Sequence, residues 1–266
     1  SAFLGDIWSL LNPWKILFGW MEQLWLRLNS GRDLAPVLRY PAKAGVWPGL
    51  LLFLIFAWIE NVYVDAIIPS RISQMILLYS AITWAGMMLY GKNNWLRHGE
   101  VFSLVFGFLA RFAPVQTRLG HSDDWDSDTK NWSDVYSCEE STQTRRNDCL
   151  SAEKKLFLQP FASALLDREK VSISQTLFVL FLLAAVTFDG FTGTLPWLKI
   201  QNYVVEYIPN VTFINTFGLL IAVALFGGVY FLFAALMKTS SKSTLTTLEI
   251  ANAFVFTLIP IALAYH

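Results

Sequence analysis

Three ionisable side chains stand out in this 266-residue chain because they interrupt or end strongly apolar stretches. Glu60 lies toward the far end of the apolar segment 46–68, Asp189 ends a second apolar segment, and Arg111 interrupts the run 99–115. Because ionisable groups are costly in a bilayer, such residues mark ion sites, proton relays or structural pairs. Glu60 and Asp189 could share a site near one membrane face. Alternatively, Glu60 lies hydrated at headgroup level, and Arg111 extends its cation to the interface or pairs with an acid.

Two cysteines, Cys138 and Cys149, lie in the polar insert 116–155. Outside the cell they would form a disulfide, and inside it they would be free or bind metal, so both alternatives stay open. Two cysteines do not complete a zinc site, which usually needs four ligands. The acidic run 124–128 has the start of a calcium loop but lacks its glycine and its final glutamate, which favours a solvated loop.

No complete catalytic set can be assembled from the sequence. The three histidines have no partner at metal-ligand spacing within a helix, and nucleophile-elbow, P-loop and dinucleotide-glycine motifs are all missing. We therefore assign no catalytic residue and no cofactor. The sequence leans away from an enzyme without deciding the question.

Composition points to an integral membrane protein. The chain is 55% hydrophobic and 15% charged, whereas soluble domains carry about 25% charged residues. Its mean hydropathy is +0.44, and its 11 tryptophans suit interfacial aromatic belts. A net charge of zero gives no electrostatic footprint for nucleic acid. We expect an all-α, polytopic fold with about five transmembrane helices and additional interfacial amphipathic helices.

Five apolar segments are expected to span the membrane, and a sixth is shorter. Residues 99–115 are only about 17 long and contain an arginine and a proline, so we expect an interfacial or re-entrant segment. The expected spans are 46–68, 72–90, 173–188, 211–237 and 246–266. The expected parts are an N-terminal arm (1–45), a first membrane unit (46–115), a polar acidic insert (116–155) and a second membrane unit (156–266).

The N-terminal arm has the pattern of an amphipathic helix. Apolar residues recur from Ile7 to Leu28 at spacings of three and four, and Asn12 followed by Pro13 predicts an N-cap and a first helical turn. A helix rich in tryptophan on one face is typical of the membrane interface. The alternative is that this face packs against a partner protein.

Basic residues predict the orientation, since they gather on the cytoplasmic side of membrane proteins. If 99–115 does not cross, most of them fall on one side, which places the N-terminus and the insert in the cytoplasm, at the cell inner membrane. If it does cross, the insert lies outside. The chain stops at His266 inside an apolar run, so we expect the natural chain to continue. The residues on the basic side are Arg32, Arg39, Lys43, Lys92, Arg97, Arg111, Arg118, Arg168, Lys170, Lys238 and Lys242.

Several stretches resemble a family of bacterial polytopic membrane proteins commonly labelled fenitrothion hydrolase. The Thr-Phe-Asp-Gly run at 187–190 is the most specific of them. The resemblance covers nearly the whole chain and implies organophosphate ester hydrolysis and further histidine-bearing helices after residue 266. The matching stretches are 12–14, 47–48, 58–60, 86–91, 99–102, 110–114, 185–191 and 258–266.

Three functions are expected from these observations. The first is an accessory or scaffolding subunit of a larger membrane complex, whose partners are the lipid bilayer and other membrane subunits. The second, implied by the resemblance, is a metal-dependent membrane hydrolase, which would lose activity in Asp189→Asn. The third is a transporter or channel with a water-filled path past Glu60.

Overall fold

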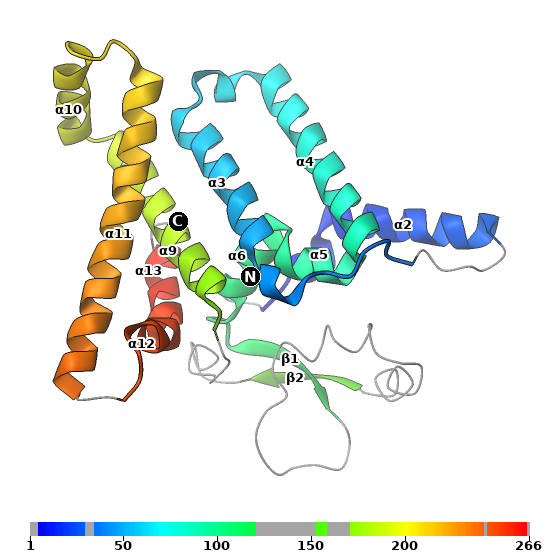
Figure 1. The fold of residues 1–266 in the computed structure, drawn as a ribbon. Coiled ribbons are helices and arrows are strands. Elements are labelled where there is room, and N and C mark those ends of the chain that lie inside the picture. The colour runs from blue at the N-terminus through cyan, green and yellow to red at the C-terminus, as the bar shows by residue number, and fades with distance from the viewer. Residues whose placement is uncertain (1–4, 30–34, 121–152, 159–170, 242–243, 265–266) are drawn as a thin grey trace.

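The computed structural model describes residues 5–29, 35–120, 153–158, 171–241 and 244–264. Its long helices run between two ends of the molecule (Figure 1). We call the end with η2 and α10 the upper end, and the end where α2, α5 and α12 lie the base. The elements are α1 (Trp8–Leu11), α2 (Pro13–Leu28), η1 (Ala42–Ala44), α3 (Trp47–Val62), η2 (Val64–Ile67), α4 (Pro69–Tyr90), α5 (Lys92–His98), α6 (Val101–Ala110), β1 (Val115–Gly120), β2 (Glu153–Leu158), α9 (Ile173–Thr192), α10 (Leu195–Val205), α11 (Val211–Ser241), α12 (Thr247–Phe254), η4 (Val255–Leu258) and α13 (Ile259–Ala264).

The predicted helical membrane fold is confirmed, with three helices in the described residues that are long and apolar enough to cross a bilayer, namely α4, α9 and α11. The other two expected spans do not form single long helices in the described residues. Helix α3 has 16 residues, which cover about 24 Å at 1.5 Å per residue. The last one is divided into α12, η4 and α13, because Pro260 has no N–H to continue the helical ladder.

Helix α9 is the centre of the core. It packs against α3, α11, α13 and η4, and 61% of its most apolar window is buried, compared with 22% for α4 and 11% for α11. Ser172 and Gln175 form a capping box at its start. The central apolar side chains come from α3, α6, α9 and η4 and include Phe53, Leu104, Phe108, Phe178, Phe181 and Phe256.

The predicted N-terminal helix is also present and runs outward along the base, crosswise to α4 (Figure 1). Asn12 caps it as expected, since its Oδ1 accepts a hydrogen bond of 3.0 Å from the Lys15 N–H. Of its predicted apolar face, Phe18 is buried against the protein, whereas Trp25 and Leu28 are exposed. Most of the arm's apolar surface therefore faces outward.

Two of the small residues of α4, Ser80 and Gly86, lie in close contact with α2 and α5. Gly91 adopts a φ of 86°, a conformation that favours glycine, and lets α5 fold back along the end of α4. Trp95 of α5 then lies directly on Gly86. From α2, the Trp14 Nε1–H donates a hydrogen bond of 2.9 Å to the Ser80 hydroxyl.

The sequence did not predict a short antiparallel strand pair at the base. β1 and β2 pair from Val115 opposite Leu158 to Gly120 opposite Glu153. This pairing brings the two ends of the polar insert together. The preceding helix α6 has ten residues, so it is too short to cross a bilayer that needs about 20.

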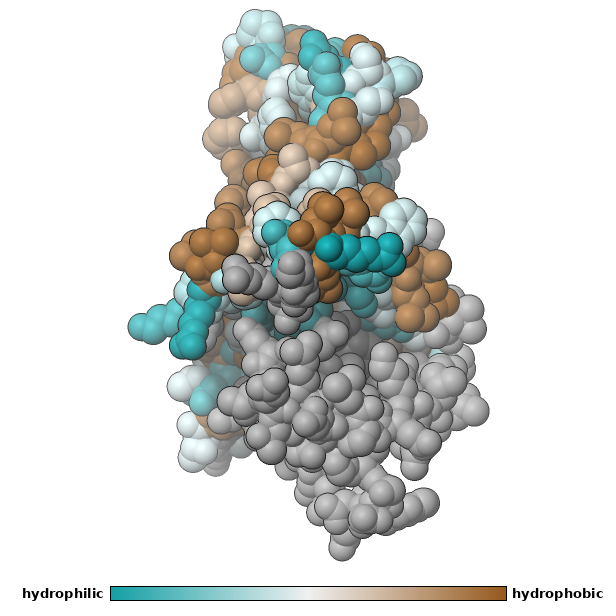
Figure 2. Space-filling view, turned by 90° about the vertical axis from the view of Figure 1, so that its right-hand side faces the viewer, coloured by the Kyte–Doolittle hydropathy of each residue, from teal (hydrophilic) through white to brown (hydrophobic). Residues whose placement is uncertain are grey.

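On the face shown in Figure 2, apolar side chains cover much of the helical part, and hydrophilic ones gather at its upper end and toward the base. α3 and α9 begin at the base, whereas α4 and α11 end there (Figure 1). Arg39, Lys43, Lys92 and Lys238 adjoin these helix ends. Most of the basic residues that the structure describes are thus grouped at one end, as the sequence predicted.

The contact of Trp95 with Gly86 predicts a steric effect. A Cβ at position 86 would overlap the indole ring, so Gly86→Ala should lower the free energy of unfolding by about 1–3 kcal/mol. Gly19→Ala on α2 is the control, because nothing lies within 4 Å of its Cβ position and alanine favours a helix. Thermal unfolding in detergent measures both, and equal stability of the two variants would contradict this packing of Trp95 on Gly86.

Candidate functional site

A fully buried carboxylate, Glu100, lies where the arm meets the base of the membrane helices. Glu100 is the N-cap of α6, and four hydrogen-bond donors surround it. Its Oε1 accepts from the Tyr79 hydroxyl at 2.6 Å and from the Phe102 N–H at 3.0 Å. Its Oε2 accepts from Asn12 Nδ2 at 3.0 Å and from the Ser103 N–H at 2.7 Å. All four contacts suit the ionised carboxylate, which has acceptors only.

These residues form what we name the Glu100 clasp, consisting of Asn12, Tyr79, Glu100 and Ser103. Asn12 caps α2 with its oxygen, and its amide nitrogen donates to Glu100 and to the Ser103 hydroxyl. The Tyr79 oxygen also accepts a hydrogen bond of 3.2 Å from the Val101 N–H. The clasp therefore joins α2, α4 and α6, and its contacts are those of a structural anchor.

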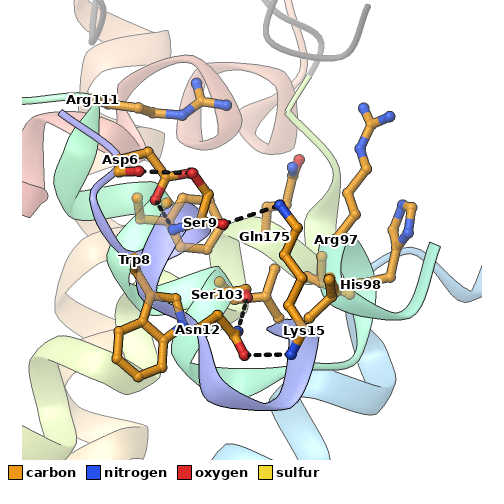
Figure 3. Close-up of a pocket in the computed structure, with 15 residues that line it drawn as sticks. Asp6, Trp8, Ser9, Asn12, Lys15, Arg97, His98, Ser103, Arg111 and Gln175 are labelled. Carbon is orange, nitrogen blue, oxygen red and sulfur yellow. Dashed lines mark hydrogen bonds between the residues drawn. The ribbon is translucent and has the colours of Figure 1, made fainter. Parts of the chain in front are cut away.

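A cavity of about 170 Å³ with both polar and apolar walls lies beside the clasp, among α1, α2, α5, α6 and the start of α9. Among the described residues, the cations Lys15, Arg97 and Arg111 line it, together with the carboxylate of Asp6 (Figure 3). Polar groups of Ser9, Asn12, His98, Ser103 and Gln175 complete its hydrophilic wall. We refer to it as the basic cavity.

Local contacts fix several of these side chains. Lys15 Nζ donates a hydrogen bond of 3.0 Å to the Ser9 carbonyl, and Asp6 Oδ1 accepts one of 3.1 Å from the Ser9 N–H (Figure 3). Burial raises the pKa of the Asp6 carboxyl above its ordinary value, although the Ser9 hydrogen bonds and the charge of Lys15 oppose this effect. The Arg111 guanidinium carbon lies 4.3 Å from the centroid of the Phe256 ring.

The structure separates the residues that the sequence singled out. Arg111 lies half-buried at the basic cavity, as a cation over an aromatic ring. Glu60 and Asp189 are both exposed, toward the far ends of α3 and α9, and line neither the basic cavity nor the apolar cavity among α9, α10 and α11. Their shared site stays a prediction. Cys138 and Cys149 lie outside the described residues.

Sequence reasoning missed Glu100 altogether. The residue directly precedes the apolar segment Val101–Ala110 and was not among the ionisable side chains that the sequence singled out. An acid in this position is itself a signal, since an N-cap carboxylate can accept hydrogen bonds from the first N–H groups of a helix. Nothing local reveals its other two partners, which lie 88 and 21 residues away in Asn12 and Tyr79.

The apolar cavity, of about 730 Å³, lies among α9, α10 and α11 toward the upper end. Its wall is almost entirely apolar and includes Phe188, Trp197 and Phe217. Across the described residues, histidine, cysteine, aspartate and glutamate side chains form no group of three that could hold a metal ion.

Comparisons with protein-family models, with curated proteins and with solved structures found no match for this chain. The resemblance to the fenitrothion hydrolase family therefore stays a prediction from the motifs that suggested it. Inference about function depends on the geometry of the described residues.

The Glu100 clasp predicts a large stability effect. Glu100→Gln should lower the free energy of unfolding by about 2–4 kcal/mol, because the amide nitrogen cannot accept the hydrogen bonds that one carboxylate oxygen now receives. Glu206→Gln, at an exposed position, should change it by less than about 0.5 kcal/mol. Thermal unfolding in detergent measures the difference. A stability of Glu100→Gln equal to that of Glu206→Gln would show that the clasp is not an anchor.

Proposed function

We propose that this chain is an accessory or scaffolding subunit of a larger protein complex in the cell inner membrane. The observation that carries the proposal is the outer half of α4, from Pro69 to Leu78. Nine of its ten residues are exposed, with Met75 half-buried. A helix at the periphery of a self-sufficient bundle buries one stripe, whereas the main packing partners of α4 in the described chain are η2, α5 and α2 rather than a long membrane helix.

The side chains of this half are suited to contact with another protein. Ile76, Leu77 and Leu78 are 56%, 70% and 64% exposed and point in successive directions around the helix. Ser73 and Gln74 are exposed on the same half. Polar side chains and small residues favour association of helices in a membrane, so a partner helix is a better neighbour here than lipid tails alone.

The arm and the distribution of charge support the same proposal. α2 extends along the base with Trp20 63% exposed and Trp25 46% exposed, a position and composition that suit the membrane interface. Basic residues are grouped at the base, which favours a cytoplasmic base with the N-terminus and the insert on that side. The clasp uses its buried polar groups to position the arm, a structural role that suits a scaffold.

Native mass spectrometry of the complex, extracted gently from its own membrane, tests this proposal. We expect a defined assembly that contains at least one other protein. Ser73→Trp should release the partner, because it adds bulk to the exposed outer half of α4. Ala224→Trp makes a similar change at an exposed position of α11 and should leave the assembly intact.

Recovery of the wild-type chain alone, or only as copies of itself, would contradict the role as a subunit. If the assembly were present and Ser73→Trp retained it, the partner would lie elsewhere than on α4, and the outer half of α4 would not be the interface.

A further inference from the structure

We propose that the basic cavity is a binding site for a phosphate-bearing anion, either the headgroup of an anionic membrane lipid or a free phosphate compound. The proposal is independent of the role as a subunit. It rests on the charge, the size and the position of the cavity.

The described lining of the cavity carries more positive than negative charge. Of the residues that the structure describes, the three cations Lys15, Arg97 and Arg111 and one carboxylate, Asp6, line the cavity, a formal excess of +2 for this part of the wall. They come from the first turn of α2, from α5 and from the end of α6, so three separate elements converge on one space (Figure 3). Arginine recognises phosphate well because its planar fork can donate two parallel hydrogen bonds.

Neutral donors accompany the cations. The hydroxyls of Ser9 and Ser103 and the amide of Gln175 are part of the wall. A phosphate group has several strong acceptor oxygens, so it is satisfied by such a mixture of hydroxyls, amides and guanidinium groups. Burial favours the protonated form of Asp6, and protonation would reduce its repulsion of an anion.

The size of the cavity selects a small group. Its volume of about 170 Å³ is below the 300–1,000 Å³ of sites for drug-sized ligands, so it suits a headgroup-sized anion. Part of the wall is apolar, formed by Trp8, Leu104 and Phe108, as expected where a headgroup passes into its lipid chains. Basic pockets between membrane helices at a basic membrane face are typical sites for lipid phosphates.

Gly107 provides a direct way to block the cavity. It lies in α6, lines the cavity, and has nothing within 4 Å of the position that a Cβ would take. A longer side chain at this position therefore extends into open space. Gly107→Glu places a carboxylate among the three cations, whereas Gly107→Ala adds one methyl group and no charge.

The test uses the full chain, purified in a neutral detergent and freed of lipid. One arm adds inorganic phosphate and measures the shift in thermal unfolding and the binding isotherm. The other adds phosphatidic acid or phosphatidylcholine and counts retained lipids by native mass spectrometry. Binding of phosphate alone identifies a free anion as a sufficient ligand, whereas retention of phosphatidic acid without phosphate binding identifies a lipid headgroup.

The variants assign the binding to this cavity. Arg97→Gln should weaken binding of the active probe about tenfold, the expected effect of losing one charge-assisted hydrogen bond. Arg39→Gln is the matched control, because Arg39 is exposed at the same end and does not line the cavity. Gly107→Glu should abolish binding, and Gly107→Ala should retain it.

The comparison of Gly107→Glu with Gly107→Ala tests anion binding at the cavity even if Arg97→Gln fails to fold. The proposal is overturned if neither phosphate nor phosphatidic acid binds the wild-type chain. It is equally overturned if Gly107→Glu binds the active probe as tightly as Gly107→Ala does.

Discussion

The cost of burying the Glu100 carboxylate constrains the whole base of this protein. A fully buried charge is tolerated only when donors replace the water it has lost. Two of the four donors are the N–H groups of Phe102 and Ser103, which the start of α6 supplies. The other two, from Asn12 and Tyr79, require α2 and α4 to be in place. The carboxylate thus makes the amphipathic arm part of the fold, although most of its apolar surface is exposed.

The Glu100 clasp explains why the two halves of α4 differ in their packing. Its base half is held by the Tyr79 hydrogen bond, by Trp14 on Ser80 and by the Trp95 ring on Gly86. Its outer half has no comparable contact with the other long helices of the described chain. The core around α9 is apolar and continuous, so it needs no support from α4. The helix is therefore fixed in direction at one end and presents its other end to the surroundings.

The sequence was sufficient wherever the determining contacts are local. Asn12 before Pro13 predicts a helix cap, and the structure confirms it. The capping boxes Ser172–Gln175 and Thr246–Glu249 likewise lie within one helical turn. The run of apolar residues likewise predicted which long segments form membrane helices.

The features that the sequence did not predict are contacts between distant residues and the lengths of two apolar helices. The small residues Ser80 and Gly86 indicate a close contact, but the pattern does not say that the neighbours are Trp14 and Trp95. The pairing of β1 with β2 joins segments on either side of the insert, so their register has no local signal. The segments 46–68 and 246–266 do not form single α-helices of that length. Apolar residues continue through η2 and η4, where the backbone leaves the α-helix.

The Glu100 clasp and the basic cavity are adjacent and share polar residues. Asn12 and Ser103 belong to both, since they bond to Glu100 or to each other on one side and line the cavity on the other. In the clasp, one carboxylate accepts from four donors, whereas three cations and one carboxylate of the described residues line the cavity. An anion bound there would contact the residues that attach the arm to the membrane helices. Binding energy at the cavity would therefore stabilise the docked position of α2, because an undocked arm would remove Lys15, Ser9 and Asn12 from the site.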